Sequence, residues 1–227
     1  MMLKGQFTGE IFDAFGDPTA QIHPSSIDHL PVTREITKAV AIPSSCSFSG
    51  PNGNLTFGGT REYFDADYFA SFSPIPVLQI RELWVGQRTE SYCNSKPRPW
   101  EQTAGGVHSA FEVLTKVEDL TIVNCETEPF FATLGTTVNG RVLLPGLQRL
   151  TVYVGCGDLN VSALTRCVEA RKEHSQPLEK VTVVWEEDAE ADVIQEVESL
   201  REFVEGLIHR VGETPKLVGR DEECSGW

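Results

Sequence analysis

The sequence lacks the long apolar segments that membrane-spanning and secreted proteins carry. No stretch approaches the roughly 18 consecutive apolar residues that a membrane-spanning helix needs. The residues that follow Met1 include polar and acidic side chains early on and contain no apolar run typical of a secretory signal. Together these absences predict a cytoplasmic or nuclear protein that has no membrane partner.

The six cysteines and five histidines show no spacing typical of a metal site. No Cys-x-x-Cys pair occurs, and in a reducing compartment the thiols are expected to be free and largely buried. The sequence also contains no Walker loop and no Gly-x-Ser-x-Gly nucleophile elbow. We therefore expect no metal, no cofactor and no catalytic residue, and a protein that is not an enzyme.

Basic residues are in the minority, with 19 Lys and Arg against 33 Asp and Glu and a formal net charge of −14. Such a charge repels the phosphates of nucleic acids and of anionic membranes, so binding to nucleic acid is not expected. The 227 residues, 40% of them hydrophobic, are enough for one elongated domain with its own core. A monomer is expected.

One short phrase with three aliphatic residues occurs four times along the chain. In each copy a second aliphatic residue follows the first by three positions, and a third follows the second by two. The middle aliphatic residues lie about 30 to 37 positions apart, a spacing typical of repeat proteins. Such arrays usually present a binding surface rather than a catalytic pocket. The copies are IRELWV (80–85), VEDLTI (117–122), LQRLTV (147–152) and LEKVTV (178–183).

Strands and helices are expected to alternate from residue 76 onward, which predicts a parallel sheet with helices on one side. The expected strands cover residues 79–85, 119–124, 148–154 and 180–184, and the expected helices cover residues 107–115, 129–134 and 161–174. Residues 1–75 read as an irregular segment because proline and glycine interrupt them often. Short strands at 38–42 and 54–57 are candidates for degenerate earlier repeats.

Residues 190–212 are expected to form a final amphipathic helix. Apolar residues recur there at intervals of three and four, which is the period of one helix face. These residues are Val193, Val197, Leu200, Val204, Leu207 and Val211. A helix at this place would cap the open edge of the array.

The second copy continues as VEDLTIVNC (117–125), which fits the leucine-rich-repeat pattern down to its cysteine. With residues 147–159, CVEAR (167–171) and EECSGW (222–227), it resembles the C-terminal region of F-box-like proteins of mushroom-forming fungi. The resemblance spans about residues 38–227 and implies a leucine-rich region that recruits a protein substrate to a cullin-type ubiquitin ligase. Residues 1–40 show no pair of amphipathic helices typical of an F-box, so binding to the ligase adaptor is not implied.

We therefore expect a short, irregular leucine-rich α/β solenoid with a mostly parallel sheet, helices on one side and a C-terminal capping helix. The predicted function is non-catalytic recognition of a protein partner. Two alternatives stay open. One is a decayed or truncated duplicate without function, and the other is a small α/β enzyme with its site between Gly155 and Asp158, where a strand turns sharply toward a helix.

Eight residues are candidates for the protein-binding surface. Seven of them come from the strands or their ends, where side chains alternate between the buried and the exposed face. Trp100 comes instead from a proline-bounded loop, and Trp185 is expected to be exposed because an acidic run follows it. The eight candidates are Arg81, Trp84, Trp100, Thr121, Thr151, Tyr153, Thr182 and Trp185.

Overall fold

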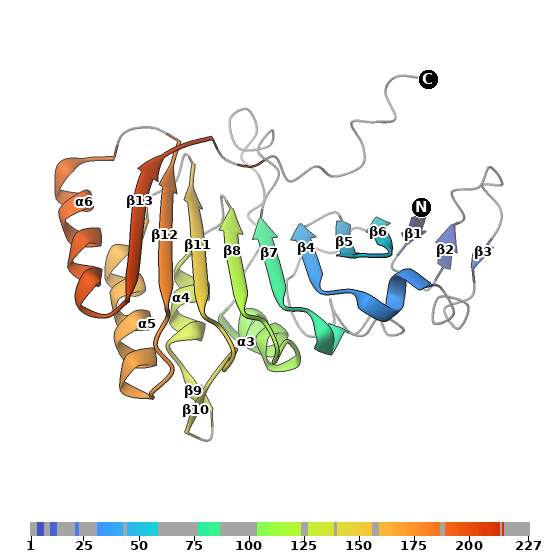
Figure 1. Cartoon of the computed structure of the whole chain (residues 1–227), viewed down its shortest axis with the longest axis horizontal. Helices are drawn as coiled ribbons and strands as arrows, with labels where there is room; N and C mark the ends of the chain where they lie inside the picture. The colour runs from blue at the N-terminus through green and yellow to red at the C-terminus, as the bar shows by residue number, and fades with distance from the viewer. Residues whose placement is uncertain are drawn as a thin grey trace.

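The main feature of the chain is one large sheet with the strand order β13-β12-β11-β8-β7-β4-β5-β6 (Figure 1). Its strands are β4 (Lys38–Ile42), β5 (Ser45–Gly50), β6 (Gly53–Gly58), β7 (Glu82–Gly86), β8 (Asp119–Val123), β11 (Arg149–Val154), β12 (Lys180–Trp185) and β13 (Gly206–Val211). The computed structural model describes residues 4–6, 10–12, 21–22, 31–42, 45–58, 77–86, 104–123, 127–138, 140–155, 159–186, 189–213 and 215.

Six of the eight strands run parallel and follow one another in chain order. β4, β7, β8, β11, β12 and β13 pair in succession, each with its parallel neighbour. The predicted α/β class with a mostly parallel sheet is therefore confirmed. The sheet has more strands than expected because the array extends at both ends.

The extension comes from two further, degenerate copies of the repeated phrase. ITKAVA (36–41) has alanine at the second and third aliphatic positions, and VEGLIH (204–209) has His209 at the third. The strand register places the same phrase position side by side in every neighbouring pair. The middle aliphatic residues thus form one buried row across the sheet, because burying apolar surface stabilises this register over any shifted one. The row consists of Ala39, Leu83, Leu120, Leu150, Val181 and Leu207.

A repeated pair of backbone hydrogen bonds extends the ladder one residue before each strand. The carbonyl oxygen of Thr37 accepts from the N–H groups of Arg81 and Glu82 at 2.7 and 3.0 Å. The carbonyls of Arg81, Glu118 and Gln148 each accept the same two bonds from the next copy. The second position of the phrase is therefore held by its backbone, which leaves its side chain free to vary.

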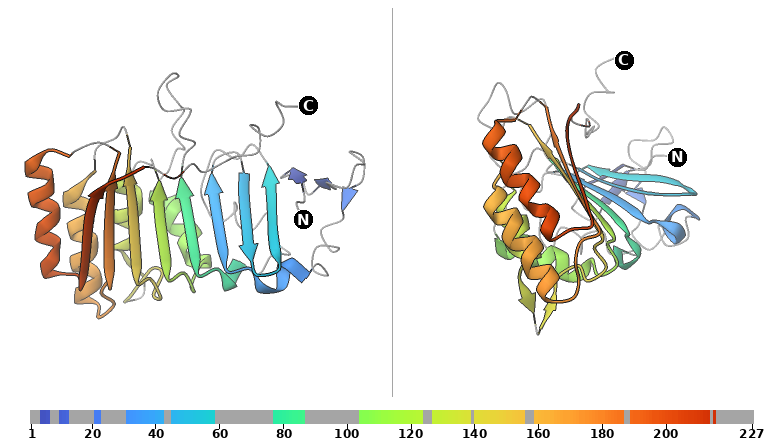
Figure 2. Two further views of the ribbon diagram at one scale, coloured as in Figure 1. Left: turned by 45° about the horizontal axis from the view of Figure 1, so that its top comes forward. Right: turned by 60° about the vertical axis from the view of Figure 1, so that its left-hand side comes forward.

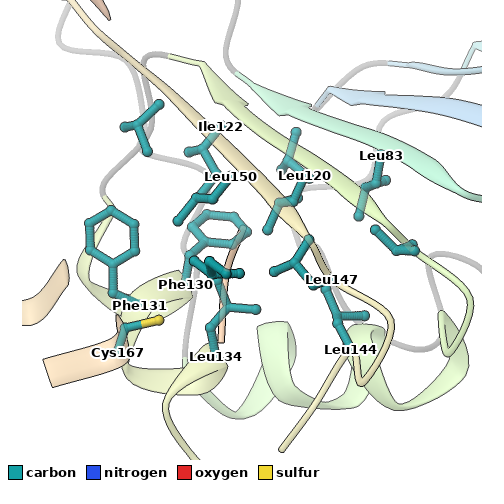
Figure 3. Close-up of a cluster of buried hydrophobic side chains, with 14 of the residues drawn as sticks. Leu83, Leu120, Ile122, Phe130, Phe131, Leu134, Leu144, Leu147, Leu150 and Cys167 are labelled. Carbon is teal, nitrogen blue, oxygen red and sulfur yellow. The ribbon is translucent and has the colours of Figure 1, made fainter. Parts of the chain in front are cut away.

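The described α-helices lie on one face of the sheet, over the part that runs from β7 to β13, as the two views of Figure 2 show. They are α3 (Ala104–Val113), α4 (Glu128–Leu134), α5 (Val161–Glu173) and α6 (Ala191–Glu198), with the short turns η1 (Pro31–Glu35), η2 (Val77–Gln79) and η4 (Ser199–Glu202). Phe130 and Phe131 of α4 lie fully buried in the same core as Leu120 and Leu150 (Figure 3). Helix α5 begins where the Asn160 side chain accepts a hydrogen bond from the backbone N–H of Ala163, at 2.9 Å.

The helix predicted over residues 190–212 is wrong in its second half. Helix α6 ends at Glu198, the turn η4 follows, and Gly206–Val211 form strand β13. Gly206 disfavours a helix interior, and the free edge of β12 offers backbone partners to the segment that follows it. The chain therefore adds a strand at this edge in place of the last turns of a helix.

The segment 1–75 contributes three strands to the large sheet, so the sheet continues across residue 75. The predicted strands at 38–42 and 54–57 correspond to β4 and to part of β6, and β5 joins them as an antiparallel partner. Two smaller sheets are made by β1 (Lys4–Gln6), β2 (Glu10–Phe12) and β3 (Gln21–Ile22), and by β9 (Thr137–Val138) and β10 (Arg141–Val142). None of the helices among the described residues combines the length and the apolar character that crossing a membrane requires.

Candidate functional site

The sheet face opposite helices α3 to α6 carries most of the residues that the sequence nominates for binding. We call it the open face. Since side chains alternate along a strand, the third and fifth positions of each phrase copy and the residue that follows the copy point to this face. The charged, aromatic and hydroxyl-bearing residues that the phrase copies place on it are Lys38, Glu82, Trp84, Asp119, Thr121, Arg149, Thr151, Tyr153, Lys180, Thr182 and Arg210.

The densest group on the open face surrounds the Trp84 side chain. The Lys38 ammonium lies 4.5 Å from the centre of the Trp84 ring, and the indole N–H donates to Glu82 Oε1 at 2.6 Å. The Tyr153 ring stacks on Trp84 with centroids 6.5 Å apart and an interplanar angle of 26°. Trp84 and Tyr153 reach over β8 from its two sides and pack against Val123, which is fully buried. The two half-buried rings therefore form a fixed aromatic platform.

Ion pairs join the charged residues of β4, β7, β8 and β11 on this face. Lys38 Nζ lies 2.7 Å from Glu82 Oε1, and the Arg149 guanidinium binds the Asp119 carboxylate through two nitrogens. The hydrogen bond that Arg149 donates to Asp119 is the main cause that raises the pKa of Arg149 above its ordinary value. Partly exposed pairs such as these add little stability, so their main effect is to orient the side chains.

Four of the eight predicted site residues lie half-buried on the open face: Trp84, Thr151, Tyr153 and Thr182. Thr121 also points to this face but is only 6% exposed, since it lies between Trp84 and Thr151 in the strand register. The expectation that the Thr121 side chain is exposed is therefore wrong.

Arg81 lies just before β7 and is well exposed. Its guanidinium pairs with Glu118 Oε1 at 2.7 Å, at the same phrase position of the neighbouring copy. Arg81 therefore lies at the edge of the sheet where the strands begin, and its exposed side chain can contact a partner that reaches over that edge.

The prediction that Trp185 is exposed is wrong. Its side chain is 7% exposed, belongs to the core beneath the helices and meets the His209 ring edge to face at 6.0 Å. Alternation explains the position, because Trp185 shares the strand face of the buried Val181 and Val183. Trp100 lies outside the described residues.

Two residues of the aromatic group, Lys38 and Glu82, were missed from the sequence. Both stand at the third position of their phrase copies, one residue before a buried aliphatic residue, and alternation assigns them to the same face as Trp84. Lys38 was missed because residues 36–41 have alanine at two of the aliphatic positions, so this segment is hard to recognise as a copy of the phrase. The signal that could have found it is the predicted strand 38–42.

The described part of the chain holds no group of three or more His, Cys, Asp and Glu residues arranged to bind a metal ion. Gly155 follows β11, whereas residues 156–158 of the alternative enzyme site lie outside the described residues. Stacked rings, a cation over an aromatic face and unbonded hydroxyl groups are features that bind another molecule's surface. Neither a protein-family model nor a curated protein nor a solved structure matches this chain.

Proposed function

We propose that the chain is a non-catalytic recognition module that binds a protein partner on the open face. The observation that carries this proposal is the Trp84 and Tyr153 platform, held by Lys38 and Glu82 on a face that the described helices leave uncovered. Tyr, Trp and Arg side chains are enriched among residues that dominate binding energies at protein interfaces. Ordering costs little here, because the rings are already fixed before a partner arrives.

The proposal includes a leucine-rich-repeat-like solenoid as the scaffold. Six copies of one phrase, stacked in register and in chain order, support this assignment. By its resemblance to fungal F-box-like proteins, the chain would serve as the substrate-binding part of a ubiquitin-ligase receptor in the cytoplasm or nucleus. We do not include binding to the ligase adaptor.

Site-specific photo-crosslinking in a fungal lysate tests the location of the binding surface. A photoreactive residue at Thr151 is expected to yield a protein crosslink, whereas the same residue at Arg166 is not. Arg166 is the matched control because it is exposed on α5, on the helix-covered side. The crosslinked partner is identified by mass spectrometry.

Two variants then test the contacts. Tyr153→Ala and Arg81→Glu are each expected to lower recovery of the crosslinked partner at least tenfold, while Arg166→Glu leaves recovery unchanged. A melting experiment on each variant confirms that the fold is intact. Unchanged recovery with both Tyr153→Ala and Arg81→Glu, or equal crosslinking from Thr151 and Arg166, would overturn the proposal.

A further inference from the structure

Polar groups without an intramolecular partner are concentrated on one half of the open face. In the described part of the chain, the side chains of Lys180, Thr182 and Arg210 make no hydrogen bond and no ion pair, nor do the hydroxyl groups of Thr151 and Tyr153. On β4, β7 and β8, by contrast, the third-position charges are paired, as Lys38 is with Glu82. The charged side chains of the open face are thus paired from β4 to β11, whereas the hydroxyl groups of β11 and the polar side chains of β12 and β13 have no partner among the described residues.

The strand register fixes how these groups are spaced. Thr182 of β12 lies beside Ile208 of β13, and Lys180 of β12 lies beside Gly206 of β13. Gly206 precedes Arg210 by four residues on the same strand. Four residues of strand and one step between strands separate the Cα atoms of Lys180 and Arg210 by about 14 Å. The two exposed cations therefore flank a centre made of the Thr182 hydroxyl and the Ile208 side chain, which is 41% exposed.

The open face of β11, β12 and β13 carries positive charge, whereas the whole molecule has a negative net charge. The charged residues on the open face of β11, β12 and β13 are Arg149, Lys180 and Arg210, all basic, in a protein of net charge −14. Asp119 neutralises Arg149, so Lys180 and Arg210 are left as unpaired cations. The exposed carboxylates of Glu179 and Glu205 stand one residue before these strands and repel an acidic ligand, so the attraction for such a ligand comes from Lys180 and Arg210 on the open face itself.

We propose that the open face of β11, β12 and β13 docks an extended acidic segment of a partner protein. Two carboxylates four residues apart bind Lys180 and Arg210, and an apolar side chain midway between them covers Ile208. An extended chain places residues i, i+2 and i+4 on one side and spans about 13 Å between the outer two, which matches the spacing of the cations. This inference rests on the proposed function and names the chemistry of its partner. Nucleic acid is the less suitable polyanion, because its dense phosphates meet the strong net negative charge of the chain.

A labelled peptide of sequence Gly-Glu-Thr-Val-Thr-Glu-Gly tests the proposal directly. Its binding to the full chain is followed by fluorescence polarisation up to millimolar protein, at low and at physiological salt. We expect saturable binding that weakens with salt, and at least tenfold weaker binding when both glutamates are replaced by glutamine. Lys180→Glu and Arg210→Glu are each expected to weaken binding at least tenfold.

Matched controls separate this surface from general electrostatics. Lys116→Glu and Arg166→Glu remove exposed cations from the turn after α3 and from α5, and they are expected to leave peptide binding unchanged. Absence of peptide binding, equal loss in these controls, or equal binding of a single-stranded oligonucleotide would overturn the proposal. Recovery of the crosslinked partner by each variant distinguishes failure of the acidic-segment proposal from failure of the proposed function. If Tyr153→Ala loses the partner while Lys180→Glu and Arg210→Glu recover it fully, only the acidic-segment proposal is overturned. If these three variants and Arg81→Glu all recover the partner fully, the acidic-segment proposal and the proposed function are both overturned.

Discussion

At the scale of single residues, one buried cation joins helix α5 to the turn that precedes β11. Arg171 has no exposed surface, and its guanidinium donates to the carbonyl oxygens of Leu143 and Leu144 at 2.9 and 3.0 Å. Leu144 adopts a φ of 49°, in the left-handed region, so the turn directs carbonyl groups inward that a strand ladder cannot bind. Burial lowers the pKa of Arg171, and the carbonyl groups offset part of that cost.

Cys167, one helical turn before Arg171, gives a pH-dependent prediction. Burial raises the pKa of its thiol from 9.0 to about 12 in the folded chain, although the nearby Arg171 acts in the opposite direction. Above pH 9 the unfolded chain therefore loses a proton that the folded chain keeps, and stability falls as pH rises toward 12. Relative to Cys167→Ala, the parent is expected to lose about 1.4 kcal/mol of unfolding free energy per pH unit in this window. Urea titrations of both proteins measure the difference, and parallel pH curves would contradict the prediction.

Residue-level reasoning from the sequence succeeded where strict alternation was followed. Trp84 and Tyr153 each stand one position after a buried aliphatic residue, and the structure brings them into contact on the expected face. Trp185 was predicted to be exposed because acidic residues follow it. Its position two residues after the buried Val183 instead assigns it to the buried face of the strand. Contact between side chains on different strands, such as Lys38 over Trp84, depends on the strand register, which becomes readable only once all six phrase copies are aligned.

At the scale of elements, the last segment shows how one set of apolar residues satisfies two periods. Leu200, Val204 and Leu207 recur at intervals of four and three, as on a helix, but Val204 and Leu207 also fit the first two aliphatic positions of the repeated phrase. A free strand edge decides between the two periods, because pairing with β12 binds the backbone groups of β13. That edge is a tertiary feature, so local propensity alone could not predict the strand.

The helical half of this segment is tested by Leu200→Asp. Leu200 is fully buried in η4, and a carboxylate placed there lacks a partner, which is expected to cost about 3 to 5 kcal/mol of stability. Gln195→Asp adds the same charge on an exposed position of α6 and is expected to change stability by less than about 0.5 kcal/mol. Urea unfolding of both variants gives the comparison. Equal midpoints for the two would show that η4 does not seal the core.

At the scale of the whole molecule, parallel strand order was predictable, whereas the antiparallel end was not. Repetition of one phrase specifies like-with-like stacking, and the observed register follows it from β4 to β13. Strand β5 was missed because serines and glycine in SCSFSG (45–50) resemble a turn, although its buried Cys46 and Phe48 show the period of a strand. The hairpin of β5 and β6 therefore depends on pairing with β4 rather than on its own propensity.

This linear order leads to a prediction about how the molecule opens. Each strand of the large sheet pairs with its immediate neighbours, so a defect at one end should weaken that end first, as in other arrays dominated by nearest-neighbour contacts. In Leu200→Asp, amide hydrogen exchange is expected to accelerate most in β13 and β12, while β4 and β7 keep the protection that they have in the parent chain. Gln195→Asp, with its exposed site, should leave all four strands as they are. If exchange in Leu200→Asp accelerates equally from β4 to β13, the sheet unfolds as one cooperative unit, and the repeat-like order of the strands has no counterpart in their energetics.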